Sequence, residues 1–331
     1  MNKKVGVKIL STGSFVPKKV LTNFDLEKMV ETSDEWISER TGIKERRILD
    51  KNQTTSDLAY NAAIKAIDRA NITVDDIDMI IVATISPDVP MPSTACYLQK
   101  KLKAYNAVAF DISAACSGFI YGVTTAKAFI ESGMYKRVLL VGVEALSRII
   151  DWTDRNTCVL FGDGAGAMIF EASDTENDII STYLGTNGDH TEILNIPAGG
   201  ANNPTSEETV KQKLHCLKMI GKEVFKISVL KMSLSVTKAQ ELVGLTDKDI
   251  DLYIPHQANL RIIEAVAKKA GIAREKVYIN VHKYGNMSAA TTIVALDEAY
   301  QEGRVKKGNL VELVAFGAGL TWGACILKIN F

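Results

Sequence analysis

Residues 73–79 read TVDDIDM and residues 246–252 read TDKDIDL, two similar stretches that lie 173 positions apart. The same offset carries VLLVGV at 138–143 onto VELVAF at 311–316. Because two independent segments share one offset, the sequence indicates a duplicated half. We therefore expect two related halves that pack together as one body.

Each half shows the same alternation of helices and strands. In the first half, residues 1–176, we expect helices at 55–70, 93–103 and 117–132 and strands at 78–84, 107–112 and 137–143. In the second half, residues 177–331, we expect helices at 222–242, 259–270 and 287–301 and strands at 251–255, 277–281 and 309–316. This alternation predicts an α/β fold with mostly parallel, buried sheets. The stretch 186–207 is predicted to be a long irregular loop, and such loops are usually functional.

The bulk composition excludes several classes of protein. Of 331 residues, 47% are hydrophobic and 24% are charged, which is typical of a soluble globular protein. Lys and Arg together number 39, as do Asp and Glu, so no overall field attracts nucleic acid or an anionic membrane surface. No run approaches the roughly 18 apolar residues of a membrane span. The five cysteines are scattered without a C-x-x-C pair, which argues against disulfides and a metal site and favours a cytoplasmic location.

The stretch DISAACSGF at 111–119 places Cys116 between a predicted strand and a predicted helix. The unpaired N–H groups at a helix start favour an anion, so we expect this thiol to ionise more readily than a free cysteine. A buried structural cysteine would look the same in the sequence. The local context alone therefore leaves both interpretations open.

A nucleophilic cysteine needs a partner that handles charge and protons. His256 follows the strand DLYIP, at the carboxyl end of a sheet where sites in α/β folds lie. Asn286 opens the helix of GNMSAAT, where capping is the ordinary role of an asparagine. The 173-residue offset places Asn286 opposite Ser113, three positions before Cys116, so two related helix starts should face one pocket.

Two glycine clusters need separate interpretations. GDGAGA at 162–167 fits a dinucleotide-binding pattern on paper, but the β-like MIFEA follows it instead of a helix, so we expect no nicotinamide site. FGAGLTWG at 316–323 follows a strand and offers bare backbone N–H groups that suit an oxyanion hole. A tight turn between two strands would give the same pattern.

The stretch TSDEWISERTGIKERR at 32–47 begins with the spacing of a capping box, Thr32 to Glu35, and places Trp36 and Arg40 on one helix face. An aromatic ring beside a guanidinium suits a nucleobase and phosphates. The alternative is a solvated basic helix end.

Together, DISAACSGF, PHQANLRI, YGNMSAAT and FGAGLTWGA closely resemble the β-ketoacyl-acyl-carrier-protein synthase III family of thiolase-fold condensing enzymes, over the full length and in the family's order. The resemblance implies a five-layered αβαβα fold from two duplicated halves, and a homodimer. It implies a catalytic triad of Cys116, His256 and Asn286, with the backbone N–H groups of Cys116 and Ala318 as oxyanion hole.

The resemblance also implies a two-stage reaction. Cys116 takes the acyl group of a short acyl-CoA, and a malonyl-acyl-carrier protein then enters and loses carbon dioxide. His256 and Asn286 hold the thioester oxygen while the resulting enolate attacks the acyl-cysteine. The product is a β-ketoacyl-carrier protein that starts fatty acid synthesis, and no metal or nicotinamide takes part.

Further residues are assigned by the same resemblance. Arg261 would meet the acidic carrier protein, and Met91 stands in a loop that would reach into the partner subunit's primer pocket, where many family members have Phe. Because of that difference, acetyl, branched and longer primers remain open. The residues implied to bind CoA are Trp36, Arg40, Thr41, Arg155, Phe225, Lys226, Ala258 and Asn259.

Related enzymes differ at positions that can be checked in this sequence. Degradative thiolases carry a second cysteine where this chain has Ala315 and Phe316, and elongating synthases carry a histidine where it has Asn286. Hydroxymethylglutaryl-CoA synthases place a glutamate where it has Ile85. A secondary-metabolite synthase of the same subfamily would keep all of these motifs, and a non-catalytic binder on this scaffold would have lost the nucleophile.

Overall fold

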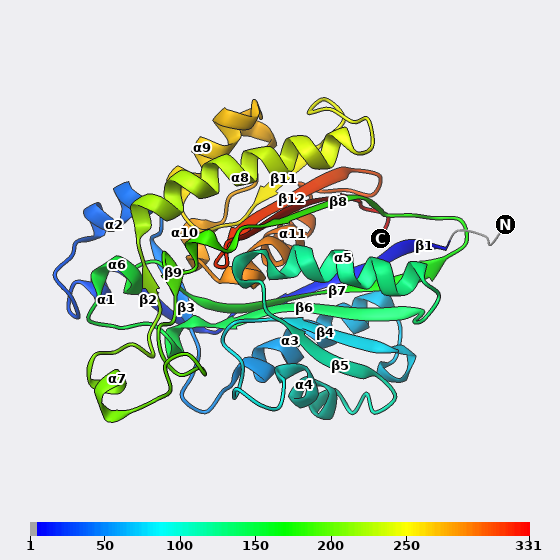
Figure 1. Ribbon diagram of the computed structural model, residues 1–331. Helices are drawn as coiled ribbons and strands as arrows, with labels where there is room; N and C mark the ends of the chain where they lie inside the picture. The colour runs from blue at the N-terminus through cyan, green and yellow to red at the C-terminus, as the bar shows by residue number, and fades with distance from the viewer. Residues whose placement is uncertain (1–4) are drawn as a thin grey trace.

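The computed structural model describes residues 5–331, which form five alternating layers of helices and sheets (Figure 1). The first sheet has the order β1-β7-β6-β4-β5, from β1 (Gly6–Phe15), β4 (Met79–Ala83), β5 (Val108–Ile112), β6 (Arg137–Ala145) and β7 (Asp163–Ser173). The second has the order β11-β12-β13-β8, from β8 (Ile179–Thr186), β11 (Leu252–Pro255), β12 (Leu310–Gly317) and β13 (Thr321–Lys328). The predicted five-layered α/β fold is confirmed.

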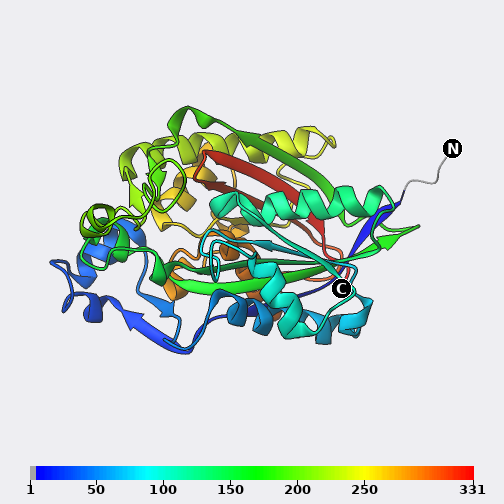
Figure 2. The same ribbon diagram turned by 60° about the horizontal axis from the view of Figure 1, so that its bottom comes forward.

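Helices cover both outer faces and fill the space between the sheets. On the first sheet lie α3 (Thr55–Ala70) and α4 (Thr94–Leu102), and the view of Figure 2 brings this layer forward. The opposite outer layer is formed by α8 (Gly221–Glu241) and α9 (Leu260–Ala270). Between the sheets run α5 (Gly118–Glu131) and α11 (Thr291–Gln301). No helix within residues 5–331 has the length and apolar character needed to cross a bilayer.

The duplication extends through the core of both halves. β4 and β11 begin 173 residues apart, as do β6 and β12, α5 and α11, and the 3-10 turns η2 (Ala115–Ser117) and η6 (Ser288–Ala290). Even the unusual backbone repeats, because Ala115 and Ser288 have φ angles of 45° and 44°. Residues that lie 173 positions apart in the sequence therefore occupy equivalent places in the two halves. Further 3-10 turns are η1 (Val74–Asp76), η3 (Leu146–Arg148), η4 (Gly188–His190) and η5 (Arg274–Lys276).

The prediction of a strand at 277–281 is wrong. Only one isolated parallel bridge forms there, between Val277 and Tyr253, before α10 (Val281–Tyr284) begins. The Oε1 atom of Gln257 accepts from the backbone N–H groups of Asn280 and Val281, at 2.9 and 3.2 Å. A side chain thus takes the donors that a continuing ladder would have used.

We propose that the two halves divide at the expected position, between residues 176 and 177. β7 ends at Ser173 in the first sheet, and β8 begins at Ile179 in the second. The middle layer joins the halves, because α11 packs against β1 and β7 while α5 packs against β13.

A segment of the first half extends from the first sheet and packs against α9. We call this segment the excursion. It contains the antiparallel pair β2 (Lys19–Thr22) and β3 (Glu45–Ile48), with α1 (Asn23–Leu26) and α2 (Asp34–Thr41) between them. Arg46 is fully buried beneath it and donates to the Leu21 carbonyl, the Asn23 side chain and the Val159 carbonyl. Burial lowers the pKa of this guanidinium to about 10, so it stays charged. Arg46 thereby ties the excursion to the body of the enzyme.

Two local expectations need correction. The helix α2 has Ser33 as its N-cap, whose Oγ accepts from Trp36 N at 3.1 Å, and the capping box expected from Thr32 to Glu35 does not form. The stretch 186–207 is not wholly irregular. It contains η4 (Gly188–His190) and β9 (Leu194–Asn195), which pairs with β10 (Lys218–Met219), and α7 (Glu207–Lys211) follows.

Candidate active site

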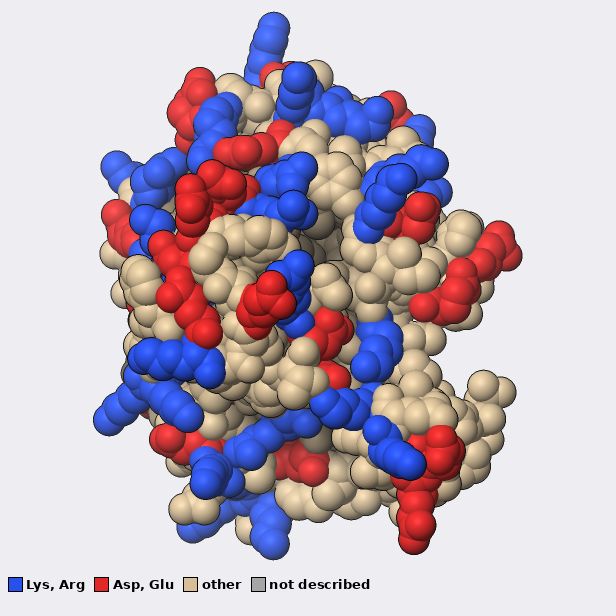
Figure 3. Space-filling model, turned by 90° about the vertical axis from the view of Figure 1, so that its left-hand side faces the viewer, with Lys and Arg blue, Asp and Glu red and all other residues tan. Residues whose placement is uncertain are grey.

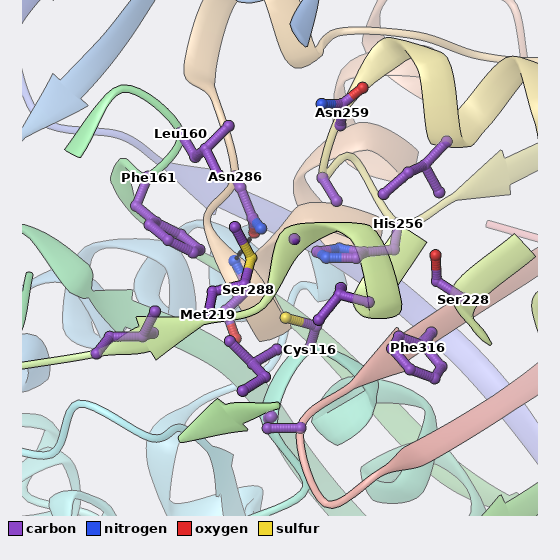
Figure 4. A pocket seen from close by; sticks show the side chains of 18 of the residues that line it. Cys116, Leu160, Phe161, Met219, Ser228, His256, Asn259, Asn286, Ser288 and Phe316 are labelled. Atoms are coloured by element: carbon purple, nitrogen blue, oxygen red, sulfur yellow. Dashed lines mark hydrogen bonds between the residues drawn. The ribbon is translucent and has the colours of Figure 1, made fainter. Parts of the chain in front are cut away.

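A cavity of about 350 Å³ lies where the two halves meet, and its walls are mostly apolar. Cys116, His256, Asn286 and Ser288 supply polar groups at its floor, and Figure 4 shows these four side chains converging from different elements. The structure therefore brings together the three residues expected to be catalytic. The apolar part of the lining includes Ile85, Leu146, Leu160, Phe161, Leu194, Ile196, Leu217, Met219, Val224, Met232, Ile262 and Phe316.

Cys116 occupies the middle of η2, the single turn that precedes α5. Hydrogen bonds fix this turn to the start of β13, because Ser117 Oγ contacts Thr321 Oγ1 at 2.7 Å and both hydroxyls reach the Ala114 carbonyl. The thiol faces the cavity and is 8% exposed. The alternative of a purely structural cysteine leaves this access unexplained.

The expectation that the helix start lowers the pKa of Cys116 is wrong for the free enzyme. Burial raises the pKa of this thiol to about 12, the Ser288 hydroxyl opposes the shift, and the nearby Glu144 carboxyl group adds to it. The end of a helix carries only a partial charge, whereas removal of the thiolate from water costs more. The Cys116 side chain is therefore a neutral thiol at rest.

His256 follows β11 directly and is held by its backbone N–H, which donates to the Val314 carbonyl at 2.7 Å. Its Nδ1 lies 2.6 Å from Thr291 Oγ1 at the start of α11, and this contact fixes the ring. Burial lowers the pKa of His256 to about 3, so the imidazole is neutral at any working pH. The Thr291 hydroxyl also lies 3.0 Å from the Ser288 carbonyl, to which it can donate. When it donates to Nδ1 instead, Nε2 carries the proton and acts as a donor toward the cavity.

Asn286 is oriented by its own backbone and by Ser288. Its backbone N–H donates to the Leu160 carbonyl at 2.8 Å, and its side-chain Oδ1 accepts from Ser288 N at 2.7 Å. The amide oxygen is thus used in a cap-like contact, as the sequence allowed. Its Nδ2 atom forms no hydrogen bond with any described residue, so a free donor remains at the cavity wall.

The turn between β12 and β13 closes the cavity beside Cys116, and Ala318 from this turn lines it. This turn and the backbone at Cys116 approach each other closely, because a Cβ at Gly317 would lie 2.6 Å from Cys116 N. FGAGLTWG is therefore both a tight turn between strands, as one interpretation of the sequence held, and part of the cavity wall. Most of GDGAGA lies within β7, which continues through MIFEA. The expected strand after the glycine cluster is therefore confirmed.

A groove of about 490 Å³ adjoins the cavity, and Phe225 and Asn259 line both. Arg40, Lys222 and Arg261 give its wall a positive charge, and none of its lining residues is acidic. On the face shown in Figure 3, Lys and Arg side chains surround the hollowed region. Such a groove favours an anionic ligand.

The groove is assembled across the excursion and α9. Asn259 caps α9 through Oδ1, which accepts from Arg261 N at 2.8 Å, while its Nδ2 donates to the Arg40 carbonyl at 3.1 Å. Gly42, with a φ of 73°, ends α2 where a Cβ would meet Leu260 at 2.5 Å. The close contact of α2 with α9 therefore requires glycine at this position.

Trp36 lies at the outer end of this groove wall. The guanidinium of Arg40 lies 4.9 Å from the ring centroid, and that of Arg155, at the start of α6 (Arg155–Cys158), lies 5.3 Å from it. Arg155 also donates to the Glu31 carbonyl at 2.8 Å. The structure thus brings Trp36, Arg40 and Arg155 together as the sequence predicted.

The other residues predicted to bind substrates differ in their positions relative to the cavity and the groove. Ala258 lines the cavity and Thr41 lines the groove, but the Thr41 hydroxyl is used inside α2, where it donates to the Ile37 carbonyl at 2.6 Å. Lys226 is exposed and lines neither, because Lys222 and Phe225 occupy the facing side of α8. Met91 is 85% exposed and lies outside the cavity of its own chain.

Sequence reasoning missed three residues of the site: Ser288, Thr291 and Glu144. Ser288 and Thr291 belong to the same NMSAATT stretch as Asn286 and are small polar residues that ordinarily cap helices. Glu144 interrupts the apolar strand RVLLVGVEA. An acidic residue within such a buried run is unusual, and the sequence alone could have marked it as a candidate functional residue. Within residues 5–331, no group of three His, Cys, Asp or Glu side chains gathers as metal ligands would.

Comparison with known proteins agrees with this geometry. The model of 3-oxoacyl-(acyl-carrier-protein) synthase III matches residues 110–188, and the model of its C-terminal part matches residues 241–329. The β-ketoacyl-(acyl-carrier-protein) synthase III of Caldanaerobacter subterraneus subsp. tengcongensis is 56% identical over 328 residues, which cover 99% of each chain. The chain belongs to the β-ketoacyl-acyl-carrier-protein synthase III family. It is an acyltransferase of the thiolase fold.

Solved structures of this family share the whole architecture. The synthase III of Aquifex aeolicus is 48% identical, with a TM-score of 0.90 over 98% of this chain and 100% of that one. The priming β-ketosynthase of the R1128 polyketide pathway is 31% identical, with a TM-score of 0.91 over 100% of this chain and 98% of that one. A 3-oxoacyl-(acyl-carrier-protein) synthase III and a priming β-ketosynthase of a polyketide pathway thus share this fold, but the higher identity lies with the former.

Proposed function

We propose that this enzyme condenses a short acyl-CoA with malonyl-acyl-carrier protein and so starts fatty acid synthesis. The observation that carries the proposal is the convergence of Cys116, His256 and Asn286 on one cavity that opens into a positively charged groove. A nucleophile, two hydrogen-bond donors and an anion-binding entrance are what a decarboxylating condensation between two thioesters requires.

In the first stage, Cys116 attacks the acyl-CoA thioester and becomes acylated. The negative charge that develops on the carbonyl oxygen needs donors on the far side of the new bond. The backbone N–H groups of Cys116 and Ala318 are our candidates, supported by the close approach of the β12–β13 turn to Cys116 N. Backbone donors are fixed before the reaction, so they need no reorganisation when the charge appears.

In the second stage, His256 and Asn286 bind the thioester oxygen of the malonyl group. Neither His256 Nε2 nor Asn286 Nδ2 donates to an acceptor within residues 5–331, and both residues line the cavity. When carbon dioxide leaves, the electron pair moves onto that oxygen as an enolate, which these donors stabilise. The enolate carbon then attacks the acyl group on Cys116, and a β-ketoacyl-carrier protein results.

The groove serves both substrates in this proposal. Trp36 and Arg155 would hold the CoA adenine, with Arg40 at its phosphates, although adenine must first displace Arg155 from the Trp36 face. Phe225, Ala258 and Asn259 would surround the pantetheine arm on its way to Cys116. Arg261 would meet the acidic carrier protein at the mouth. Lys222 replaces Lys226 as the lysine of the groove wall.

We also propose a homodimer in the cytoplasm. In the order β1-β7-β6-β4-β5, β5 is an edge strand, and such an edge offers unpaired backbone groups to a second copy. Val108 on this strand is 46% exposed, and Tyr105 just before it is 70% exposed. The exposed Met91 would then enter the partner's primer pocket. The unpaired cysteines support the cytoplasmic location.

The primer is tested by a panel of acyl-CoA thioesters with malonyl-acyl-carrier protein, from acetyl to branched and longer chains. We expect turnover with at least one short primer and none with Cys116→Ala. A Met91→Phe variant should shift the preference toward smaller primers, because a ring fills more of the pocket than a thioether. Turnover that is confined to long or aromatic starters would favour a secondary-metabolite pathway.

A further inference from the structure

Glu144 is a buried carboxyl group behind the nucleophile that the proposed mechanism does not use. It lies on β6 with no exposed surface, and no described Lys, Arg or His pairs with it. Its oxygens accept from Ser86 Oγ at 2.5 Å and from Thr84 Oγ1 and Ile85 N at 3.2 Å. All of these donors come from the segment that follows β4, and they are neutral. Burial of a carboxyl group without a positively charged partner costs free energy, so a functional role would explain why Glu144 stands here.

Ser288 lies between this acid and the cavity. It belongs to η6, which packs against both β6, the strand of Glu144, and η2, the turn of Cys116, and Ser288 and Cys116 line the same cavity (Figure 4). The residue is 1% exposed, and its Oγ is buried without a hydrogen bond of standard geometry. A hydroxyl that lines a cavity with its bonding capacity unused is available for transient bonds during a reaction.

The backbone at Ser288 strengthens this interpretation. Its φ of 44° lies in the left-handed region, which glycine adopts at little cost and serine does not. Glycine at this position would fit the turn better but would lack a hydroxyl. The equivalent position in the first half, Ala115, has the same backbone and carries no polar group. The side chain of Ser288 therefore points to a function of its own.

We propose that Ser288 relays the proton of the Cys116 thiol to Glu144 when the cysteine is acylated, and that Glu144 stores this proton until condensation releases the cysteine. The inference rests on the proposed role of Cys116 as the acyl acceptor. In this relay Ser288 is a catalytic residue, because its hydroxyl, which lines the cavity with Cys116, would take the proton directly from the reacting sulfur. Glu144 acts through Ser288 as the store of the proton.

The proton balance of the first stage is complete. As the bond between Cys116 Sγ and the acyl carbon forms, the thiol proton moves to Ser288 Oγ, and the Ser288 hydroxyl proton moves to the Glu144 carboxylate. The bond from the acyl carbon to the CoA sulfur breaks, and CoA leaves as a thiolate that takes a proton from solvent. The products are acyl-Cys116, a neutral Glu144 and free CoA. No free cysteine thiolate is needed at any point.

The second stage returns the stored proton. The malonyl group loses carbon dioxide, its enolate carbon bonds to the acyl carbon, and Cys116 departs with the electron pair of its carbon–sulfur bond. Glu144 sends its proton back through Ser288 to that sulfur. Over the cycle one solvent proton is consumed, which is the proton that CoA took. While the malonyl carboxylate occupies the cavity, Glu144 is neutral and does not repel it.

The electrostatics of the pair suit this exchange. Burial raises the pKa of Glu144 to about 7, and the negative charge of Glu144 in turn raises the pKa of the Cys116 thiol. The two acids therefore share one proton, because two negative charges at this distance in a buried site cannot coexist. The groups that face Glu144 are Ser86, Thr84, Ile85 N, Ser288 and Cys116, and none of these carries a positive charge.

The test is the pH dependence of Cys116 alkylation by iodoacetamide, followed on its peptide by mass spectrometry so that exposed Cys96 does not interfere. For the wild-type enzyme we expect a rate that rises near pH 7, as Glu144 ionises, and rises again at high pH, as the thiol ionises. Ser288→Ala should lose the rise near pH 7 and react at least 10-fold more slowly at pH 7.5. Glu144→Gln should lose the same rise, and its high-pH rise should move to lower pH because a negative charge is gone.

Glu312→Gln is the matched control, since Glu312 is an equally buried carboxyl group away from the cavity, and it should leave the Cys116 profile unchanged. The proposal is overturned if the rise near pH 7 survives in Ser288→Ala, or if this variant lowers the rate equally at every pH. If Glu144→Gln does not fold, Ser288→Ala still tests the proposal. This variant should fold, because it removes a hydroxyl that forms no hydrogen bond within the described residues. Alkylation needs no acyl-CoA, so this result is independent of the primer and of the condensation assay.

Discussion

Asn286 presents a hydrogen-bond donor to the cavity because the other end of its amide is already occupied. Ser288 N holds Oδ1, which leaves Nδ2 as the atom that can meet a substrate oxygen. The same logic applies to His256, whose Nδ1 is held by Thr291. At the scale of single residues, the proposed condensation therefore depends on two contacts within the protein that fix which atom would face the substrate.

Asn286→Ala should remove one of the two donors to the enolate oxygen. A donor of this kind contributes about 2.7–4 kcal/mol to a transition state, so condensation should slow by about 10²- to 10³-fold. Acylation of Cys116 should continue, because Asn286 takes no part in that stage. Rapid-quench measurement of both stages separates the two effects, and an equal loss in both would contradict the assigned role.

Thr291→Val should disturb His256 without touching the substrate. Valine has no hydroxyl, so His256 Nδ1 loses the partner that holds the ring and selects its tautomer. We expect condensation to slow by about 10- to 100-fold, with acylation little changed. Thr291→Ser keeps the hydroxyl and should restore most of the rate. If valine and serine behave alike, Thr291 does not set the state of the histidine.

The convergence of Cys116, His256 and Asn286 on one cavity could be predicted from the sequence, but the protonation state of Cys116 could not. Its position at a helix start predicts a thiol that ionises more readily than a free cysteine, and its burial reverses that expectation. Burial depends on the whole surrounding fold, which no local stretch reports. Thr291 and Ser288 look like ordinary capping residues in the sequence, and their functions depend on neighbours from other elements.

Among the elements, the β12–β13 turn has the strictest requirement. A Cβ at Gly317 would come 2.6 Å from Cys116 N, within the space that the proposed oxyanion hole occupies. Gly317→Ala should therefore push the turn away from η2 and slow acylation by at least 10-fold. Gly188→Ala is the control, since a Cβ there meets nothing within 4 Å, and its rate should equal that of the wild type. A wild-type rate in Gly317→Ala would mean that the turn does not stabilise the oxyanion.

Elements that repeat across the two halves were predicted well, because the offset of 173 residues is preserved in β4, α5 and β6 and in their partners. Elements that break the repeat were predicted poorly. The strand expected at 277–281 fails because Gln257 captures its backbone donors, and this side chain is remote in sequence. The duplicated pattern therefore determines the layers, while single long-range contacts decide where the halves differ.

At the scale of the whole molecule, stability should depend on pH through Glu312, a second buried acid. Burial raises the pKa of Glu312 from 4.5 to about 8, and Gln240 is the only residue in the described part of the chain that donates to it. Between these values the unfolded chain has lost the proton while the folded enzyme still holds it. The free energy of unfolding should therefore fall as pH rises from about 4.5 to about 8, by up to about 1.4 kcal/mol per pH unit from this group.

Glu312→Gln should abolish this part of the dependence, so its stability relative to the wild type should increase steadily between pH 5 and pH 8. Urea unfolding at several pH values measures the effect, and the exposed Glu39→Gln serves as control. If the difference between Glu312→Gln and the wild type were the same at pH 5 and pH 8, Glu312 would be ionised in the folded enzyme and the account of its burial would be wrong.

The central claim is that Cys116 accepts an acyl group from CoA and passes it to a malonyl unit. Intact-protein mass spectrometry after mixing with the preferred acyl-CoA tests this claim most directly. We expect one acyl group per chain, located on Cys116, which disappears when malonyl-acyl-carrier protein is added and persists under the same chase in Asn286→Ala. An enzyme that stays unlabelled with every primer, or a Cys116→Ala variant that labels as the wild type does, would contradict the claim.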